Sequence, residues 1–381
     1  SPIGLTDATV SPFIGQYDAD AATTGNQEYA RGGVKFSRMT GRAVVDYELT
    51  RNNLIYASVS RGYKSGGINP PIDPQFNVSP TFTPETINAL EIGSKNTFMD
   101  GMVRLNLSGF YYDYKGLQLS RIVGRTSVND NTDATIWGGE AEAVFRPTTN
   151  LLMNLSASYL KSKIKNLSLI DPSDVSGGRS DAVIIKDLQG GANCVVTSAF
   201  GGAAAQGFVN AVNSATFGAV GGLPAIAPVP GTNANGAFGL CGVLRANAGP
   251  GFTVNDGIAE DLSGNELPQA PKLKLSAGAQ YTFRFGNGLT LVPRADVAYT
   301  GRFYARSFNR PIDRVKGFTV VNAQIQLNGA DDRWNIRAFV SNLTKNDAIT
   351  GQFVSDASSG LFTNVFTLEP RVFGVGAGVK F

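Results

Sequence analysis

The strongest constraint on this chain is a two-residue period in hydropathy that recurs along most of its length. In residues 273–283, odd positions carry Leu, Ala, Tyr and Phe, whereas even positions carry Lys, Ser, Gly, Gln and Thr. Successive side chains of a β-strand point to opposite faces, so this pattern predicts a strand with one apolar and one polar face. The alternation recurs at 43–49, 103–111, 141–145, 151–159, 289–299, 321–327 and 334–340, and more weakly at 55–59 and around 90–92. No segment shows a convincing helical period, which predicts an all-β fold.

Three details favour a membrane barrel over a soluble sandwich. The apolar faces mix Ala and Gly with Leu and Val and place aromatic residues near strand ends, as lipid and its two interfaces allow. The strands are longer than the usual five or six residues, and a tilted membrane strand needs roughly 9–11. Short and long connections also alternate along the chain. We therefore expect a transmembrane antiparallel β-barrel fold with about 11 strands in this chain.

The connections fix the expected topology. Short turns are expected near 50–53, 99–101, 147–150, 286–288 and 329–333. Long connections are expected near 64–84, 124–135, 162–270, 305–316 and 345–362. Short and long connections alternate strictly along the chain if residues 102–123 form one strand that rises above the membrane.

Composition excludes several functions. The 381 residues include no histidine and two cysteines, and the formal net charge is +3. These counts exclude histidine-dependent catalysis, a histidine-ligated metal and a four-cysteine metal site, so we expect no enzyme, cofactor or metal centre. The near-balanced charge predicts no nucleic-acid partner. No run approaches the roughly 20 apolar residues of a membrane helix. The first residues show no signal-peptide pattern, and a mature or truncated chain would also lack one.

The end of the chain has the pattern of an outer-membrane insertion signal. The residues that share its apolar face are Phe373, Val375, Ala377, Val379 and Phe381. A final aromatic residue would lie at the inner interface, and the intervening glycines would leave the lumen side unobstructed. The alternative is an ordinary edge strand that ends in Phe.

Several ordered motifs resemble the C-terminal half of a TonB-dependent receptor barrel. They are LIYASVSRGYKSGG at 54–67, PETINALEIGSK at 84–95, FYYDY at 110–114, GGEAE at 138–142, PQAPK at 268–272 and VSNLT at 340–344. The resemblance implies a multi-pass protein of the Gram-negative outer membrane with a 22-stranded barrel, an internal plug and a TonB box. It also implies outer-membrane lipid, the barrel-assembly machinery and the TonB-ExbB-ExbD energising complex as partners.

The sequence departs from that pattern, since it has no plug, no TonB box and only half the strands. We expect residues 1–36 to be an extracellular loop segment and residues 37–381 to be the C-terminal half of the barrel. An odd number of strands also leaves an unpaired edge, which is costly in lipid. The other half is then expected in another chain, an absent segment or a cleaved piece.

The long extracellular loop, 162–270, contains the two cysteines. Cys194 and Cys241 are expected to form a disulfide, because an extracytoplasmic compartment permits one, and two free thiols are the alternative. The loop is expected to be a lid or a ligand-contacting loop, and the alternative is a flexible loop or one that contacts the surface layer. A surface lipoprotein is a candidate partner that would cover it. Its acidic residues Asp256, Glu260, Asp261 and Glu266 could bind Ca²⁺, but their spacing matches no EF-hand.

The best candidate ligand-binding surface combines Tyr112 and Tyr114, on the polar face of one strand, with the nearby Arg121 and Arg125. Such a rim would suit an anionic or aromatic ligand. Other charges are expected on the lumen side, where they are solvated or hold a plug: Arg42, Asp46, Glu48, Arg104, Glu140, Glu142, Lys274, Arg294, Asp296 and Arg337.

The leading functional hypothesis is energised uptake of a scarce small-molecule substrate such as a ferric siderophore, oligosaccharide, vitamin or small aromatic compound. The runner-up is a passive diffusion channel, or porin, which would have neither a plug nor a TonB box. A complete 12-stranded translocator conflicts with the odd number of strands. A barrel enzyme with a histidine-containing site conflicts with the absence of histidine. A soluble all-β adhesin would stay monodisperse without detergent.

Overall fold

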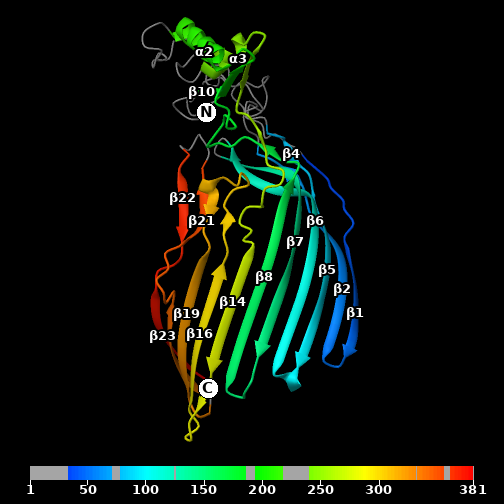
Figure 1. Cartoon of the computed structure of the whole chain (residues 1–381), viewed down its shortest axis with the longest axis vertical. Helices are drawn as coiled ribbons and strands as arrows, with labels where there is room; N and C mark the ends of the chain where they lie inside the picture. Colours follow the sequence, from blue (N-terminus) through cyan, green and yellow to red (C-terminus); the bar gives the residue numbers. More distant parts are fainter. Residues whose placement is uncertain are drawn as a thin grey trace, which may run out of the picture.

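A single curved wall of antiparallel strands dominates the computed structural model (Figure 1), which describes residues 33–70, 78–123, 126–185, 194–217, 240–331, 333–355 and 361–380. Eleven strands pair in chain order, each with the next, and β1 and β23 form the two edges of the sheet. The expected antiparallel β architecture and the eleven strands expected in this chain are confirmed. The strands are β1 (Gly41–Thr50), β2 (Asn53–Lys64), β5 (Glu85–Phe98), β6 (Val103–Val123), β7 (Thr126–Phe145), β8 (Leu151–Lys165), β14 (Leu273–Tyr281), β16 (Thr290–Thr300), β19 (Phe318–Asn328), β20 (Trp334–Ser341) and β23 (Val372–Val379).

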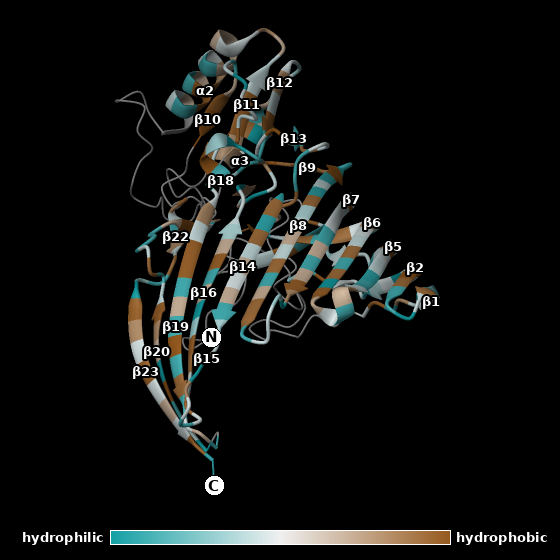
Figure 2. Cartoon of the chain, turned by 60° about the horizontal axis from the view of Figure 1, so that its bottom comes forward, coloured by the Kyte–Doolittle hydropathy of each residue, from teal (hydrophilic) through white to brown (hydrophobic). Residues whose placement is uncertain are grey.

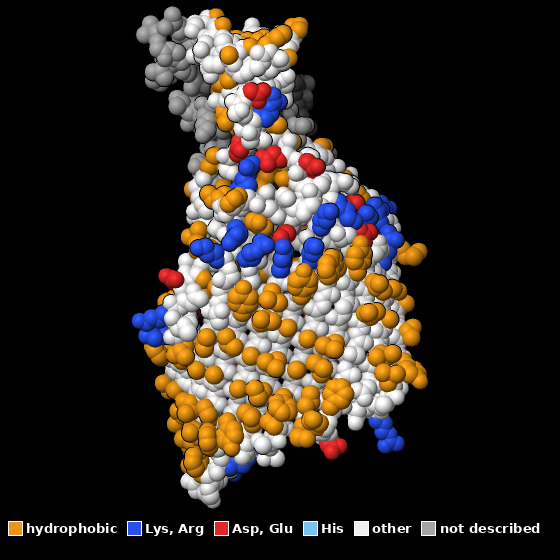
Figure 3. Space-filling model, viewed as in Figure 1, with side chains coloured by type: hydrophobic (Ala, Val, Ile, Leu, Met, Phe, Trp, Pro, Cys, Tyr) orange, Lys and Arg blue, Asp and Glu red, His pale blue; other side chains and the backbone are white. Residues whose placement is uncertain are grey.

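Strand register keeps the apolar residues of neighbouring strands on one face. Val45 lies opposite Ala57, which lies opposite Ile92 on the following strand. At the other edge, Ala338 lies opposite Val375. Val45 and Val375 are 73% and 77% exposed, and side chains like them form an apolar belt over the wall (Figure 3). Figure 2 shows the alternation of hydrophobic and hydrophilic residues along the strands. We call this belt-bearing side the outer face and the opposite, polar side the inner face.

The hairpin of β6 and β7 extends beyond the other strands. Its pairing continues from Val103 opposite Phe145 to Val123 opposite Thr126. The expectation of one long strand over 102–123 is confirmed, but the loop expected at 124–135 is wrong. Its Asn, Asp and Thr residues look like a loop, yet their backbone pairs with β6. The register shifts between Tyr114 and Leu117, and Gly116 takes a φ of +66° there.

The described residues between β8 and β14 lie above the wall (Figure 1), and we call them the cap (166–185, 194–217 and 240–272). It contains the strands β9 (Ser168–Leu169), β10 (Val183–Ile185), β11 (Cys194–Ser198), β12 (Phe252–Asn255) and β13 (Glu260–Asp261) and the helices α2 (Gly202–Phe217) and α3 (Leu240–Asn247). Strands β10, β11 and β12 form one small sheet, and β9 pairs with β13. The prediction that no segment is helical is therefore wrong. Gly, Ala and Asn dilute the apolar stripe of α2, and tertiary packing of the few apolar residues stabilises it.

Short hairpins complete the other connections. They are β3 (Gly67–Ile68) with β4 (Thr81–Phe82), β17 (Phe303–Tyr304) with β18 (Arg314–Val315), and β21 (Ile349–Val354) with β22 (Thr363–Thr367). The 3₁₀ turns η2 (Met99–Gly101) and η4 (Pro311–Asp313) lie in two connections, and β15 (Phe283–Arg284) pairs with β16. Within the described ranges, no helix has the length and apolar character to cross a membrane.

Candidate functional site: the inner face and the cap

The inner face of the wall is lined by polar side chains that bond across strands. The Tyr56 hydroxyl donates a hydrogen bond to Glu91 Oε1 on the next strand at 2.7 Å. Gly93 lies opposite Tyr56, and a Cβ there would lie 2.6 Å from the tyrosine hydroxyl. The ring therefore lies across Gly93, where a larger residue would overlap it. A glycine in a strand often marks such a close approach.

A second polar group bridges β8, β14 and β16. Arg294 donates hydrogen bonds to Asp296 Oδ2 at 2.8 Å and to Asn154 Oδ1 at 3.0 Å. Gly278 lies between them, since a Cβ there would be 2.7 Å from Arg294 Nη2. Two of the lumen charges expected from alternation thus form an ion pair with each other on the inner face.

The aromatic candidates for ligand contact both lie on the inner face but have different surroundings. Tyr112 stacks on Phe110 with ring centroids 4.8 Å apart and planes 22° apart, and its side chain is half-buried. Tyr114 packs against an apolar cluster at the base of the cap, whose buried members include Ile164 and Leu262. Tyr112 is thus the more accessible of the two.

Of the two basic candidates, the structure describes only Arg121. Arg121 forms an ion pair with Asp130 across the β6–β7 hairpin, so its charge is already neutralised. Arg125 lies outside the described residues. The rim of Tyr112, Tyr114, Arg121 and Arg125 as a ligand surface therefore stays a prediction.

The terminal strand places Phe373, Val375, Ala377 and Val379 in a row on the outer face. They lie opposite Val340, Ala338, Ile336 and Trp334 of β20. Phe381 lies outside the described residues. The glycines between these apolar residues face inward. The Phe339 ring covers Gly374, and the Asn335 side-chain amide covers Gly378, both from β20.

A polar recess lies at the end of the wall away from the cap. It has a volume of about 230 Å³ and is lined by the turn between β1 and β2 and by the adjacent ends of β5 and β6. Its charged lining residues are Glu48, Arg51, Lys95 and Arg104. Three of these four side chains are cations, so the recess suits an acidic or hydrogen-bonding group.

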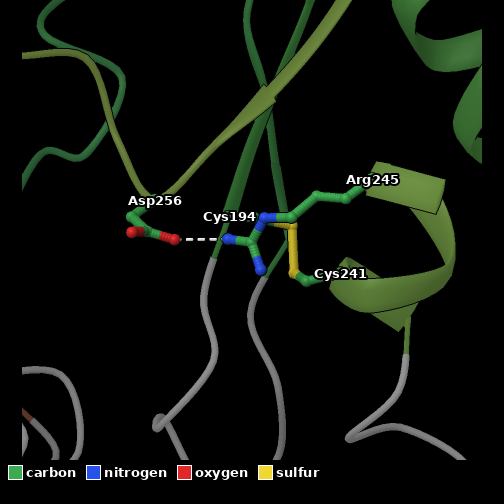
Figure 4. Close-up of a disulfide and its surroundings, with 4 residues drawn as sticks. All are labelled: Cys194, Cys241, Arg245 and Asp256. Carbon is green, nitrogen blue, oxygen red and sulfur yellow. Dashed lines mark hydrogen bonds and ion pairs between the residues drawn. A yellow bond between two sulfur atoms is a disulfide. The ribbon is translucent and has the colours of Figure 1, made fainter. Parts of the chain in front are cut away.

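The cap has its own apolar core, fixed by the predicted cysteine pair. Cys194 on β11 and Cys241 on α3 form a disulfide with a Cα–Cα separation of 5.9 Å (Figure 4). Both cysteines are buried, and the ion pair between Arg245 and Asp256 lies beside them. The remaining buried members of this core are Val196, Ala205, Val209, Leu240 and Leu244. The described part of the loop is thus a folded, disulfide-stapled unit.

An ionic network fixes the cap to the neighbouring connection between β16 and β19. Arg306 donates to Asp171 Oδ1 at 2.9 Å and to Asp313 Oδ1 at 2.6 Å, and Arg310 donates to Asp171 Oδ2 at 2.8 Å. Both aspartates are almost fully buried. Burial alone would raise the pKa of Asp171, but hydrogen bonds from Ser173 and the charge and hydrogen bond of Arg306 outweigh it and lower the pKa below its ordinary value.

Sequence reasoning missed this network. Asp171 is 135 residues from Arg306 and 139 residues from Arg310 in the sequence, so no local spacing reveals these two ion pairs. The only sequence signal is the alternation at Asp313, Arg314 and Val315, which places Asp313 on the buried side with Val315.

The acidic residues of the loop have separate partners instead of forming one site. Asp256 pairs with Arg245, Glu260 with Arg310, and Glu266 with Lys272. Asp261 accepts a hydrogen bond from the Ser263 backbone at 2.9 Å. Across the described ranges, no group of His, Cys, Asp or Glu side chains is arranged to hold a metal ion.

The comparisons with known proteins agree with this architecture. The family model described as "TonB dependent receptor-like, beta-barrel" matches residues 15–343. None of the curated proteins matches the sequence. Among solved structures, the ferric yersiniabactin uptake receptor FyuA of Yersinia pestis is similar with a TM-score of 0.57 and 17% identity, covering 90% of this chain and 37% of that one.

Two further receptor structures are similar to a lesser degree. The ferric-catecholate import receptor Fiu of E. coli K12 has a TM-score of 0.51 and 15% identity, with 90% of this chain and 35% of that one covered. The siderophore receptor PiuA of Acinetobacter baumannii has a TM-score of 0.51 and 16% identity, with 89% and 35% covered. The chain thus spans little more than a third of the length of these receptors. At these identities the likeness shows the fold, and the family match identifies the chain: it belongs to the TonB-dependent receptor-like β-barrel family.

Proposed function

We propose that this chain forms the C-terminal part of an outer-membrane transporter that takes up a scarce small molecule with energy supplied through TonB. The observation that carries the proposal is the inverted distribution of apolar residues. The eleven-strand wall exposes its apolar face, whereas the buried apolar residues lie mostly in the cap and at its base. Soluble monomers rarely expose apolar patches larger than a few hundred Å², and a continuous belt of this kind fits a lipid bilayer.

In this arrangement the cap lies outside the cell and the polar recess lies on the periplasmic side. The polar inner face would contact a plug supplied by another part of the receptor. The outer row of β23, with Phe381 beyond it, would serve as the signal for the barrel-assembly machinery. A ferric siderophore is the first substrate class to test, because the three similar structures are a ferric yersiniabactin uptake receptor, a ferric-catecholate import receptor and a siderophore receptor.

The decisive experiment compares active transport with passive diffusion. The full-length receptor is expressed in cells that lack their own siderophore receptors, and ⁵⁵Fe uptake is measured with a panel of catecholate, hydroxamate and citrate chelates. Active transport predicts uptake that disappears when the TonB-ExbB-ExbD complex is deleted, together with no open-channel current in planar bilayers. TonB-independent uptake with a steady conductance would instead establish a porin.

A matched pair of variants tests the ligand surface. We propose that the Phe110–Tyr112 stack is a flat aromatic platform for the solute on the inner face. Tyr111→Leu is the control, because Tyr111 is the neighbouring residue on the outer face. An aromatic stack contributes about 1 kcal/mol, so Tyr112→Leu should raise the half-saturation concentration for uptake about fivefold, and Tyr111→Leu should leave it unchanged. Equal effects of the two substitutions would refute the platform.

A further inference from the structure

The polar recess at the end of the wall away from the cap is built by one short stretch of the chain. All of its lining residues lie between positions 48 and 106, in the β1–β2 turn and the adjacent ends of β5 and β6. Its volume of about 230 Å³ is below the roughly 300–1,000 Å³ of sites that enclose a whole small molecule. The recess therefore has room for one polar group of a ligand and not for an entire chelate.

Strand register places two cations of the recess on the inner face. Lys95 is four residues from Glu91, which lines that face, and alternation keeps the two side chains together. Lys95 lies opposite Leu54 on β2 and opposite Asn106 on β6. Arg104 is two residues from Asp- and amide-free backbone on neither side but from Asn106 itself, so it shares the same face.

The cations of the recess have no carboxylate partner. Lys95, Arg104 and Arg51 are exposed, and within the part of the chain that the structure describes none of them takes part in an ion pair. The Lys95 ammonium lies 6.0 Å from the centroid of the Tyr56 ring, which carries no charge to neutralise it. The three positive charges are therefore available to a ligand.

Two acids of the inner face flank these cations without pairing with them. Glu48 is separated from Lys95 by the position of Leu54, and Glu142 is separated from Lys95 by the position of Asn106. Neighbouring strands lie about 4.8 Å apart, so the backbone of each acid is roughly 10 Å from that of Lys95 across the sheet. Three cations against two flanking acids leave one net positive charge at the recess.

We propose that the recess binds one carboxylate group of a small anionic molecule, with Lys95 and Arg104 as the donors. Hydrogen bonds from lysine or arginine to a carboxylate are roughly twice as strong as those between neutral groups. This inference rests on the membrane orientation given under the proposed function. In that orientation the recess lies at the periplasmic end of the inner face, where a carboxylate-bearing solute would leave the lumen. Because solvent screens exposed charges, the recess would hold the solute briefly and then release it.

The test places one thiol in the recess and measures how the charge of a small reagent changes its reaction rate. Asn106→Cys puts the thiol opposite Lys95, and the two native cysteines are bonded to each other. The full-length receptor, in neutral detergent and with any other free cysteine replaced by serine, is treated with the anionic sulfonate MTSES or the cationic trimethylammonium MTSET. Heat-dependent mobility in SDS gels verifies that each barrel is folded.

The net charge of the recess sets the expected preference. In water, one unit of positive charge about 7 Å away raises the local concentration of a monovalent anion about threefold and lowers that of a cation as much. After division by the rates with free cysteine, MTSES should therefore react at least about fivefold faster than MTSET. Millimolar citrate, used as the carboxylate probe, should slow MTSES more than chloride of the same ionic strength does.

Three charge variants in the Asn106→Cys background separate the recess from the rest of the lumen. R51Q/K95Q/R104Q should abolish both the preference for MTSES and the protection by citrate. R51K/K95R/R104K keeps the charge and should keep both. The matched control R42Q/K274Q/R337Q, which neutralises three exposed inner-face cations outside the recess, should also keep both.

Equal normalised rates of the two reagents would overturn the proposal, as would an unchanged preference in R51Q/K95Q/R104Q. Protection of the thiol from both reagents without citrate would also overturn it, because another part of the receptor would then fill the recess. None of these readouts requires transport. A receptor without TonB-dependent ⁵⁵Fe uptake therefore contradicts the proposed function, whereas the thiol rates decide this inference separately.

Discussion

The disulfide of the cap should determine how often the cap opens, without affecting the wall. Cys194 and Cys241 are separated by 47 residues, and a cross-link that closes a loop of this size stabilises by about 4 kcal/mol in the chain-entropy model. That free energy corresponds to roughly a thousandfold change in the opening equilibrium. Reduction should therefore release the cap while the eleven-strand wall remains folded.

Hydrogen exchange measured by mass spectrometry on the full-length receptor in detergent tests this prediction. Peptides from β11, α2 and α3 should exchange up to about a thousandfold faster after reduction, and those from β16 and β19 should not change. The variant C194A/C241A should behave like the reduced wild type, because both lack the cross-link. Unchanged protection of the helices would refute the reasoning, and so would equal loss of protection in the wall.

Three further results are expected from the packing and the charges. Gly374→Val should lower the folded fraction in heat-modifiability gels because its side chain would overlap a neighbouring ring, whereas Gly376→Val, which has open space, should not; equal losses would contradict the packing argument. Arg306→Met should expose the cap base to limited proteolysis, because breaking a buried ion pair costs about 3–5 kcal/mol. The control Arg333→Met removes an exposed pair worth under about 1 kcal/mol, and equal proteolysis of the two variants would exclude a stabilising role for the network. Folding lowers the pKa of Asp171 below its ordinary value. The ionised carboxylate therefore stabilises the cap base above that ordinary pKa, and this stabilisation is lost as pH falls through the pKa of the folded state. Hydrogen exchange at the cap base should rise only below about pH 4. Asp171→Asn should remove this acid step, and an identical step in that variant would assign it to another group.

Much of the wall could be predicted because its side chains obey a strictly local rule. Tyr159 and Leu273 each follow the alternation of their own strand, and pairing of those strands then places them on the same face. Lipid enforces the rule, since one misplaced residue would shift every side chain of a strand to the other face. The bulge after Tyr114 interrupts the rule, and Lys115–Gly116 is its only local signal.

The cap was harder to predict because its structure depends on long-range packing. The stripe of Ala205, Phe208, Val209 and Val212 has helical spacing, so α2 left a signal in the sequence that its surrounding Gly and Asn residues obscure. The ligand surface was predicted from residue types alone. The structure shows that Arg121 is already paired with Asp130, which sequence spacing cannot reveal.

The pairing of β9 with β13 has a consequence for how such a receptor diversifies. Ser168 lies opposite Asp261, so the chain enters and leaves the cap at neighbouring points. The cap is therefore an insertion whose ends already meet, and its gain, loss or exchange leaves the register of β8 and β14 intact. Under the proposed function, recognition at the cell surface could then change by exchange of the whole cap, while the strand register of the wall stays the same.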